Sequence, residues 1–441
     1  MWKRRRILAI TISALAALLL LGAGCGADSA AEPVELTMWH TYVEQMKTDF
    51  DELVEEFNEG PGAEAGIRVT VTSVANSSVL NEKLLMAASG DPGAPEPPDI
   101  AVIYPKIAVT LQSGGKLADL DDYFTEEELA AYVPAFLEEG RFAGGDGGLY
   151  LLPIAKSTEV LYVNRTIFDR FAAETPGATL EMLGTFEGIL SLAGQYYAWT
   201  DAQTPEASGD GKAFYYPDGL FNWYMVGAEQ LGGHLVVDGR IDEGSSAFRK
   251  LNDAYLSGAA GGGVAIFNDY GNYLAKTGDA VCVTSTSAGA QFYPDEVTYA
   301  DNTKEAAVFD VLPYPVFEGG EKVAIQRGGG LCLLRSDEGR ERAAAAFMKW
   351  LTEPAQNERF AAKAGYMPVT SEARAQEADD ALVRKMLETV AGMQEGGYRF
   401  YVPPVFDGFD EMQTAFVEEA QQQAGARKAE GAEAAEAAEG A

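Results

Sequence analysis

The N-terminal part of this chain alternates strand patterns with amphipathic helix patterns. Apolar or alternating strand segments are separated by helical segments with apolar residues on one face. In chain order, the strand and helix segments are predicted at 34–40, 42–59, 66–74, 77–90 and 97–105. Ser77 or Ser78 is the expected N-cap of the second helix. Such alternation favours a mixed, mostly parallel sheet flanked by helices, so the predicted fold class is α/β.

The rest of the 441 residues continues with strands and helices and gives room for two or three domains. A helix is predicted over 339–354, halted by Pro354. Residues 418–441 are rich in Ala and Glu and predict a helix that frays into a low-complexity tail over 425–441. Further strands are predicted at 279–289, 307–317 and 326–336.

The first 33 residues have the layout of an export signal. A basic start at Lys3 to Arg6 precedes a short apolar run, too short to span a bilayer, which ends at Gly22-Ala23-Gly24-Cys25. This ending resembles a bacterial lipobox, although Gly22 stands where such motifs usually carry Leu. The resemblance implies a lipoprotein signal peptide at 1–24, lipidation of Cys25 and a tether at 25–33. The alternative is ordinary signal cleavage nearby, with Cys25 incidental.

The charge of the chain excludes one class of partner. The formal net charge is −34, and removal of the four basic residues of the leader takes it to −38. Nucleic-acid phosphates need a basic face, so no nucleic-acid binding is expected. Three cysteines are few for an exported protein. Cys282 and Cys332 lie in apolar runs and are predicted to be buried free thiols, with a single disulfide as the alternative.

Few residues point to catalysis or to metal binding. The chain has only two histidines, His40 and His234, which excludes a histidine-based metal cluster within one chain. The motifs G-x-S-x-G and H-E-x-x-H and the P-loop do not occur in the sequence. With 67 acidic residues, a carboxylate pair at glycosidase spacing is expected by chance. We therefore expect no enzyme, no cofactor and no metal site.

Several segments occur in an order that resembles one protein family. These segments are "MWHTY", "GLYLLPIAKSTEVLYVNRTIF", "GDAVCVTSTSAG", "GGGLCLL" and "AGYMPVT". Together they resemble the extracellular solute-binding proteins of bacterial ATP-driven (ABC) importers, in the carbohydrate and glycerol-3-phosphate branch. The resemblance implies a two-lobed periplasmic-binding-protein fold of type II, with a ligand cleft between the lobes.

The resemblance also implies that the chain passes between the lobes three times. Crossings are expected near 153–157, 311–315 and 352–356. The expected segments are 34–154 plus 316–352 for lobe one and 158–310 plus 356–424 for lobe two.

Candidate ligand contacts lie in loops at strand ends, where ligands of open α/β sheets gather. Sugar binding needs aromatic faces and polar groups, and both occur in these loops. Lys156 and Arg327 add positive charge to loops that are expected to face the cleft, and together they keep an anionic ligand possible. The resemblance to the glycerol-3-phosphate-binding branch, carried over residue by residue, implies a site made of Trp39, His40, Ser77, Ser157, Trp223, Ser287, Gly329 and Tyr366, to which Lys156 is added.

Two departures from that branch leave the ligand open. Pro105 and Lys106 stand where the branch has an acidic residue, and Phe406 and Asp407 stand about where it has a phosphate-holding arginine. The leading prediction is a carbohydrate-binding component that delivers its solute to importer permease subunits. The alternative is the same scaffold binding glycerol-3-phosphate or a glycerophosphodiester. More distant alternatives are a secreted glycoside hydrolase and a surface adhesin. The predicted molecule is an exported monomer, anchored by lipid to the membrane on its periplasmic or extracellular side.

Overall fold

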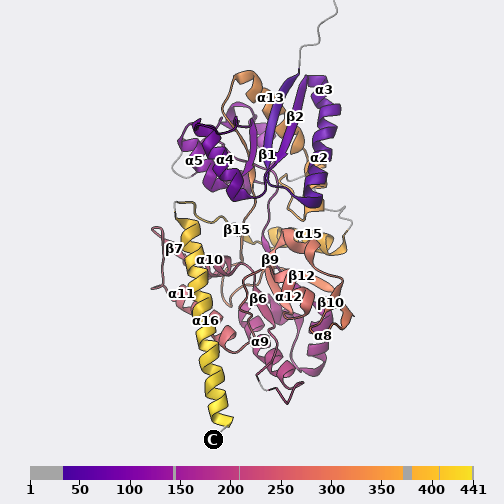
Figure 1. Ribbon diagram of the computed structural model, residues 1–441, viewed down its shortest axis with the longest axis vertical. Coiled ribbons are helices and arrows are strands. Elements are labelled where there is room, and N and C mark those ends of the chain that lie inside the picture. Colours follow the sequence, from indigo (N-terminus) through magenta and orange to yellow (C-terminus); the bar gives the residue numbers. More distant parts are fainter. Residues whose placement is uncertain (1–32, 143–145, 208, 371–379, 407, 440–441) are drawn as a thin grey trace, which may run out of the picture.

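The computed structural model describes residues 33–142, 146–207, 209–370, 380–406 and 408–439. The predicted signal peptide, most of the tether, and the lipidation site Cys25 lie outside the described residues. Within the described part, no helix is long and apolar enough to cross a membrane. Figure 1 shows two lobes, each built around its own sheet.

The first lobe contains a five-stranded mixed sheet. Its strands, in spatial order, are β2 (Ile67–Ser73), β1 (Val34–His40), β3 (Ile100–Ile103), β14 (Gly330–Leu333) and β4 (Leu152–Pro153). The first three run parallel, whereas β14 is antiparallel to both of its neighbours. The late strand β14 thus completes a sheet begun by the first hundred residues.

Helices cover both faces of this sheet. Apolar residues of α2 (Glu44–Glu59) and α13 (Glu338–Leu351) share one core cluster, and those of α4 (Ser77–Ser89) and α5 (Pro105–Ser113) share another. Figure 1 places these two helix pairs on opposite sides of β1. The N-cap of α4 is Asn76, whose Oδ1 accepts from the Val79 amide at 3.0 Å, so the prediction of Ser77 or Ser78 as N-cap was wrong. Asn and Ser are both good N-caps, so local sequence does not separate adjacent candidates.

The second lobe contains a four-stranded sheet. Its spatial order is β12 (Phe309–Leu312), β5 (Glu159–Asn164), β9 (Cys282–Thr286) and β6 (Tyr215–Pro217). Strand β5 is antiparallel to both neighbours, and only β6 and β9 run parallel. The α/β class and the mixed sheets are confirmed, but this sheet is more antiparallel than predicted.

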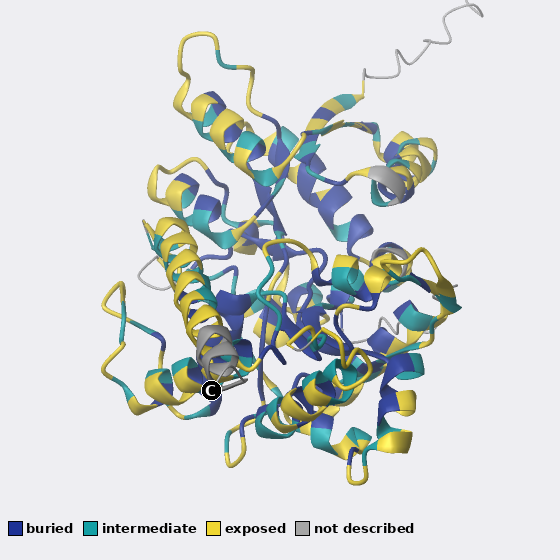
Figure 2. Cartoon of the chain, turned by 60° about the horizontal axis from the view of Figure 1, so that its bottom comes forward, coloured by how far each residue is buried: buried dark blue, intermediate teal, exposed yellow. Residues whose placement is uncertain are grey.

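The core of the second lobe is rich in aromatic side chains. Phe186 of α9 (Phe186–Asp201) packs edge-on against Trp223 of α10 (Leu220–Gln230), with 5.5 Å between ring centroids. Every residue of α10 is buried. Figure 2 shows the buried residues inside both lobes and the exposed ones on outer turns and loops. The helix α10 is therefore a central support of this lobe.

The crossings of the chain differ in place from those predicted. Lys156 and Ser157, close to the first expected crossing, pair with Met367 and Arg327. Phe317, beyond the second expected crossing, still packs on Phe186, and β13 (Val323–Ile325) pairs with β15 (Arg399–Tyr401) beside α10. The return to the first lobe therefore falls at 326–329. An apolar strand pattern such as 307–317 is equally suited to either lobe, so its sequence does not show where the chain leaves the second lobe.

Pro354 begins a new helix in the first lobe, although a crossing to the second lobe was expected around it. It is the first residue of α14 (Pro354–Ala364), which packs on α2 through Phe360 and Phe50, with ring centroids 5.5 Å apart. Thr370 still pairs with Tyr132 of the first lobe. The chain is therefore still part of the first lobe at Thr370, whereas α15 (Ala381–Glu395) packs on β12 of the second. Proline is favoured in the first turn of a helix as well as after a helix, so Pro354 is ambiguous in sequence.

The C-terminal segment forms one long helix, α16 (Phe409–Glu439). It lies along α11 (Ser246–Ala260) and α10, as Figure 1 shows in yellow. Phe416 packs against Tyr224 of α10 with ring centroids 4.9 Å apart, and Ala420 and Ala424 are buried. The helical part of the tail prediction is confirmed, and the helix is anchored to the second lobe up to Ala424.

Both described cysteines are buried and free. Cys282 lies in β9 and Cys332 in β14, so they belong to different sheets. Burial raises the pKa of the Cys332 thiol to about 12, which keeps it protonated. The prediction of free thiols is confirmed.

The crossing segments lie side by side and are joined by backbone hydrogen bonds. Ser157 and Arg327 exchange two bonds, with N–O distances of 2.9 and 2.8 Å. On the other side, Lys156 and Met367 exchange two more, at 3.3 and 2.6 Å. We call these three paired segments, 156–157, 327 and 367, the crossing ribbon.

A buried ion pair lies beneath the crossing ribbon. The Lys156 ammonium is 2.6 Å from Glu139 Oε2, and the two side chains are 1% and 5% exposed. Gln326 donates to the same carboxylate oxygen at 2.6 Å. Burial lowers the pKa of Lys156, and the charge of Glu139 opposes that effect. Lys156 and Gln326 lie in two different crossing segments, and both bind Glu139, which follows α7 (Pro134–Glu138).

We expect Lys156→Met to destabilise the protein by about 3–5 kcal/mol, because it leaves the Glu139 charge buried without its cation. Urea unfolding measures this cost. The double variant Lys156→Met/Glu139→Met should recover much of it. As a control, Lys47→Met removes an exposed ion pair with Asp51 and should cost less than about 1 kcal/mol. Equal effects of Lys156→Met and Lys47→Met would contradict the structural role of Lys156.

Candidate functional site

The crossing ribbon adjoins the edge of the second sheet where polar side chains gather. Strands β6 and β9 both end there, followed by Asp218 and Ser287, and β5 begins there at Glu159. The Thr158 amide donates to Ser287 Oγ at 3.2 Å, which ties the end of β9 to the crossing. Open α/β sheets bind ligands beyond the carboxyl ends of such strands. This edge, next to the first lobe, is the candidate site.

Asp218 is held at this edge by its neighbour strand. Ser285 Oγ donates to Asp218 Oδ2 at 2.5 Å, and the Asp218 amide donates to the Thr284 carbonyl at 3.0 Å. Burial raises the pKa of Asp218, and the bond from Ser285 opposes that rise. Asp218 as a residue is only partly buried, and its carboxylate is fixed in position by the Ser285 hydroxyl.

Glu159 lies behind Asp218 and is 2% exposed. Its Oε1 accepts from Asn222 Nδ2 at 2.7 Å. Burial raises the pKa of Glu159 to about 7, the Asn222 bond and the Arg327 charge oppose the rise, and Asp218 adds to it. Sequence analysis missed Glu159, Asp218 and Asn222. The signal for Glu159 was a single acidic residue at the start of an otherwise apolar strand.

Arg327 connects the two lobes electrostatically. It is exposed, and its positive charge acts on Glu159 and Asp218 of the second lobe and on Tyr366 of the first. Burial raises the pKa of Tyr366 to about 12, with a further contribution from Tyr104. Tyr104 is 45% exposed. An exposed cation, two carboxylates and two phenol rings are therefore grouped where the lobes meet.

Three of the predicted site residues in the first lobe are partly buried. Trp39 lies near the end of β1 and packs on the cluster formed with α4 and α5, and Ser77 is the first residue of α4. Gly329 follows the crossing, and a Cβ there would come within 3.0 Å of the Ile103 carbonyl oxygen. All three positions belong to the first lobe and lie at or near the end of a strand or helix.

His40 is enclosed in an aromatic cluster. It is fully buried, stacks on Tyr42 with ring centroids 5.0 Å apart, and its Nδ1 accepts from the Tyr42 amide. Burial lowers the pKa of His40 to about 4, so the imidazole is neutral at physiological pH. In this conformation, His40 supports the end of β1 from inside the lobe.

The remaining predicted residues are buried at or behind the crossing. Ser157 and Ser287 are 5% and 0% exposed, and Lys156 is engaged with Glu139. Trp223 is 2% exposed and surrounded by aromatic rings, including Phe317 at 5.4 Å between centroids. The structure thus brings Ser157, Ser287 and Tyr366 to the candidate site, whereas Trp223 lies in the core of the second lobe.

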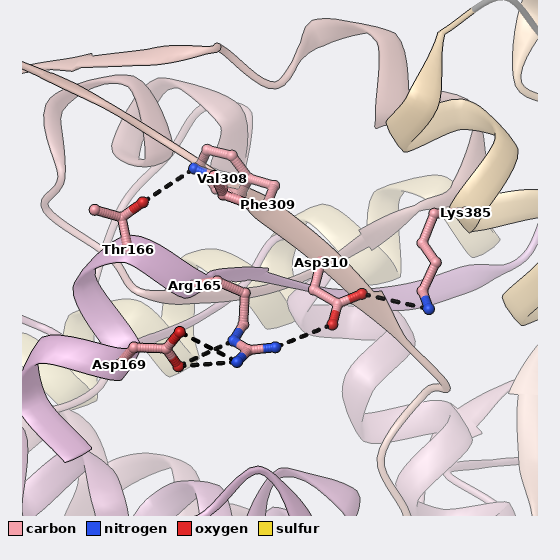
Figure 3. A pocket seen from close by; sticks show the side chains of 7 residues that line it. All are labelled: Arg165, Thr166, Asp169, Val308, Phe309, Asp310 and Lys385. Carbon is pink, nitrogen blue, oxygen red and sulfur yellow. Dashed lines mark hydrogen bonds and ion pairs between the residues drawn. The ribbon is translucent and has the colours of Figure 1, made fainter. Parts of the chain in front are cut away.

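A separate surface pocket of about 480 Å³ lies at the other end of β5 (Figure 3). Arg165 contacts Asp169 at 3.0 Å and Asp310 at 3.4 Å, and Lys385 lies 3.7 Å from Asp310. The figure shows these charges facing one another across the pocket. Because its cations are matched by carboxylates, this pocket is a weaker candidate than the crossing. Among the described residues, no group of three or more His, Cys, Asp or Glu is arranged to hold a metal ion.

Solved structures of other proteins share this fold. The cyclic alpha-maltosyl-1,6-maltose binding protein from Arthrobacter globiformis is 18% identical, with a TM-score of 0.68 over 90% of this chain and 94% of that one. UgpB from Mycobacterium tuberculosis, in complex with glycerophosphocholine, is 17% identical, with a TM-score of 0.67 and coverages of 91% and 98%. The Listeria monocytogenes substrate-binding protein Lmo0181, in complex with cycloalternan, is 16% identical, with a TM-score of 0.67 and coverages of 90% and 94%. These likenesses confirm the two-lobed fold.

The sequence itself identifies the family. No curated protein matches the chain. Residues 52–385, however, match the family model of bacterial extracellular solute-binding proteins. This match covers most of both lobes and includes the crossing ribbon. The chain therefore belongs to the bacterial extracellular solute-binding protein family.

Proposed function

We propose that this protein captures a carbohydrate-class solute at the crossing and delivers it to the permease subunits of an ABC importer, without catalysing a reaction. The observation that carries the proposal is that Arg327 of the crossing ribbon acts electrostatically both on Asp218 of the second lobe and on Tyr366 of the first, which is in turn influenced by Tyr104. Carboxylates accept hydrogen bonds from sugar hydroxyls, and aromatic faces pack on the C–H patches of a sugar ring.

The distribution of charge favours a neutral solute. Lys156 is engaged with Glu139 inside the protein, so its charge is balanced there. Arg327 faces Glu159 and Asp218, whose negative charges disfavour a phosphate at the same place. Relatives of this fold that bind cyclic alpha-maltosyl-1,6-maltose and cycloalternan give further support.

A glycerophosphodiester is the second candidate solute. Arg327 is an exposed cation at the crossing, and guanidinium groups bind phosphate well. The UgpB structure with glycerophosphocholine supports the same alternative. The two candidates differ in charge, so salt dependence separates them.

We expect a neutral oligosaccharide, and not glycerol-3-phosphate or glycerophosphocholine, to raise the melting temperature. A solute at 100 times its dissociation constant stabilises by about 2.7 kcal/mol. Calorimetry at 0.1 M and 1 M salt should give similar affinities, because a neutral solute is little affected by screening. Tight, salt-sensitive binding of glycerophosphocholine that is lost in Arg327→Ala would instead establish the phosphodiester.

We expect Tyr366→Ala and Trp223→Ala to have opposite signatures. Tyr366→Ala should weaken solute binding by about 1–3 kcal/mol with little change in unfolding, as for a contact residue. Trp223→Ala should cost about 3–5 kcal/mol of stability, because the indole fills the core beside Phe186. Calorimetry and urea unfolding measure the two effects. A stable Trp223→Ala variant that does not bind would instead place Trp223 in the site.

Export and membrane attachment complete the proposal. The family is one of extracellular proteins, and the basic start and short apolar run of the chain support cleavage before Cys25 and lipidation there. A monomer held by acyl chains would present both lobes to the permease subunits from the outer side of the membrane.

We expect mass spectrometry of the native N-terminus to find Cys25 carrying acyl chains. The variant Cys25→Ser should lose them and be released from membranes into the soluble fraction. Detection of a free, unmodified N-terminus downstream of Cys25 would contradict the lipid anchor.

A further inference from the structure

Glu159 is a buried acid that no solute can reach directly. Its side chain is 2% exposed and lies at the start of β5, between the crossing ribbon and α10. A buried carboxyl group is costly unless it is hydrogen-bonded, so its partners indicate why it is there.

The partners of Glu159 all belong to one turn. Glu159 Oε1 accepts from Asn222 Nδ2 at 2.7 Å. A Cβ added at Gly219 would lie 2.7 Å from the same oxygen and 2.9 Å from Asn222 Nδ2. The absence of a side chain at Gly219 thus lets the carboxyl group approach the first turn of α10. That turn is closed by the Trp223 amide, which donates to the Gly219 carbonyl at 2.8 Å.

The same turn carries Asp218. On its other side, Asp218 is fixed by Ser285 Oγ at 2.5 Å. Asp218 is therefore held between β9, through Ser285, and the turn that Glu159 supports through Asn222. Asp218 is also bound through its own amide to the Thr284 carbonyl of β9 and by the Gly271 amide, so loss of the Glu159 support would loosen the α10 side of the turn and leave these bonds in place.

We propose that Glu159 is a positioning residue for solute binding: through Asn222 and Gly219 it fixes the turn that presents Asp218, and its ionisation sets solute affinity. This inference rests on the proposed function only in taking Asp218 to be a solute contact. The support of the turn itself does not depend on which solute binds.

The groups around Glu159 determine the direction of the pH effect. Arg327 of the crossing ribbon is the cation that acts on Glu159, Asp218 is the neighbouring acid, and the buried phenols of Tyr215 and Tyr314 also sense its charge. Burial raises the pKa of Glu159 to about 7. Above that pH the carboxylate keeps its bond to Asn222, but the cost of burying its charge is larger than the gain from that bond, which is why the pKa is raised. The closed turn therefore favours the protonated acid, and support of the turn, and with it solute affinity, should fall as the pH rises through 7.

Glu159→Gln tests the proposal, because the amide keeps the shape of the side chain and does not titrate. Hydrogen exchange at the Trp223 amide, corrected for the intrinsic pH dependence of exchange, reports on the turn without any solute. In the parent, protection should decrease about three- to tenfold from pH 6 to pH 8. In Glu159→Gln it should be independent of pH and close to the parent value at pH 6. The control Glu55→Gln, on the exposed face of α2, should follow the parent.

Calorimetry with maltotriose at pH 8 and pH 6 supplies the second measurement. The affinity of the parent should weaken about three- to tenfold at pH 8 relative to pH 6, and that of Glu159→Gln should not change with pH. The same pH profile of exchange in Glu159→Gln and the parent would overturn the proposal, whatever maltotriose does. The proposal would also be overturned if exchange in Glu159→Gln is independent of pH but the affinity of this variant for maltotriose still follows the pH profile of the parent. If maltotriose binds to no variant, exchange alone decides the role of Glu159, and only the assignment of this sugar fails.

Discussion

The ion pair between Lys156 and Glu139 is the constraint on which the junction of the lobes depends. A lysine that is 1% exposed is compatible with folding only if its charge is matched, and the carboxylate at 2.6 Å matches it. Gln326 binds the same oxygen from the second crossing segment. One carboxylate thus fixes two passages of the chain. The backbone pairing of Ser157 with Arg327 follows from that arrangement, and so does the position of the guanidinium beside Glu159 and Asp218.

The candidate site is a consequence of where the second sheet meets this junction. The ends of β6 and β9 and the start of β5 converge on the crossing, so their polar residues are gathered without any local motif. Each of these residues has a supporting partner: Ser285 for Asp218, Asn222 for Glu159 and Thr158 for Ser287. This preorganisation is what a binding site needs in order to limit the entropy lost on binding.

Sequence alone predicted the α/β class and the early strands, because their patterns are local. It could not predict that Trp223 is in the core, since α10 is buried on all sides and has no polar face from which an orientation could be read. Lys156 was ambiguous for a related reason. Its partner Glu139 is 17 residues away, and only the fold brings the two charges together. The second and third crossings were expected at 311–315, within an apolar strand, and at 352–356, around Pro354, because neither pattern indicates to which lobe it belongs.

The crossing ribbon also limits how the lobes move relative to each other. Sliding one segment past its neighbour would break the paired hydrogen bonds of Lys156 with Met367 and of Ser157 with Arg327 together. Twisting or bending the ribbon requires only small changes in backbone dihedral angles and keeps those bonds. The ribbon therefore favours rotation of the lobes over sliding. The angle between the lobes is then a property that a partner protein could sense without contacting the solute.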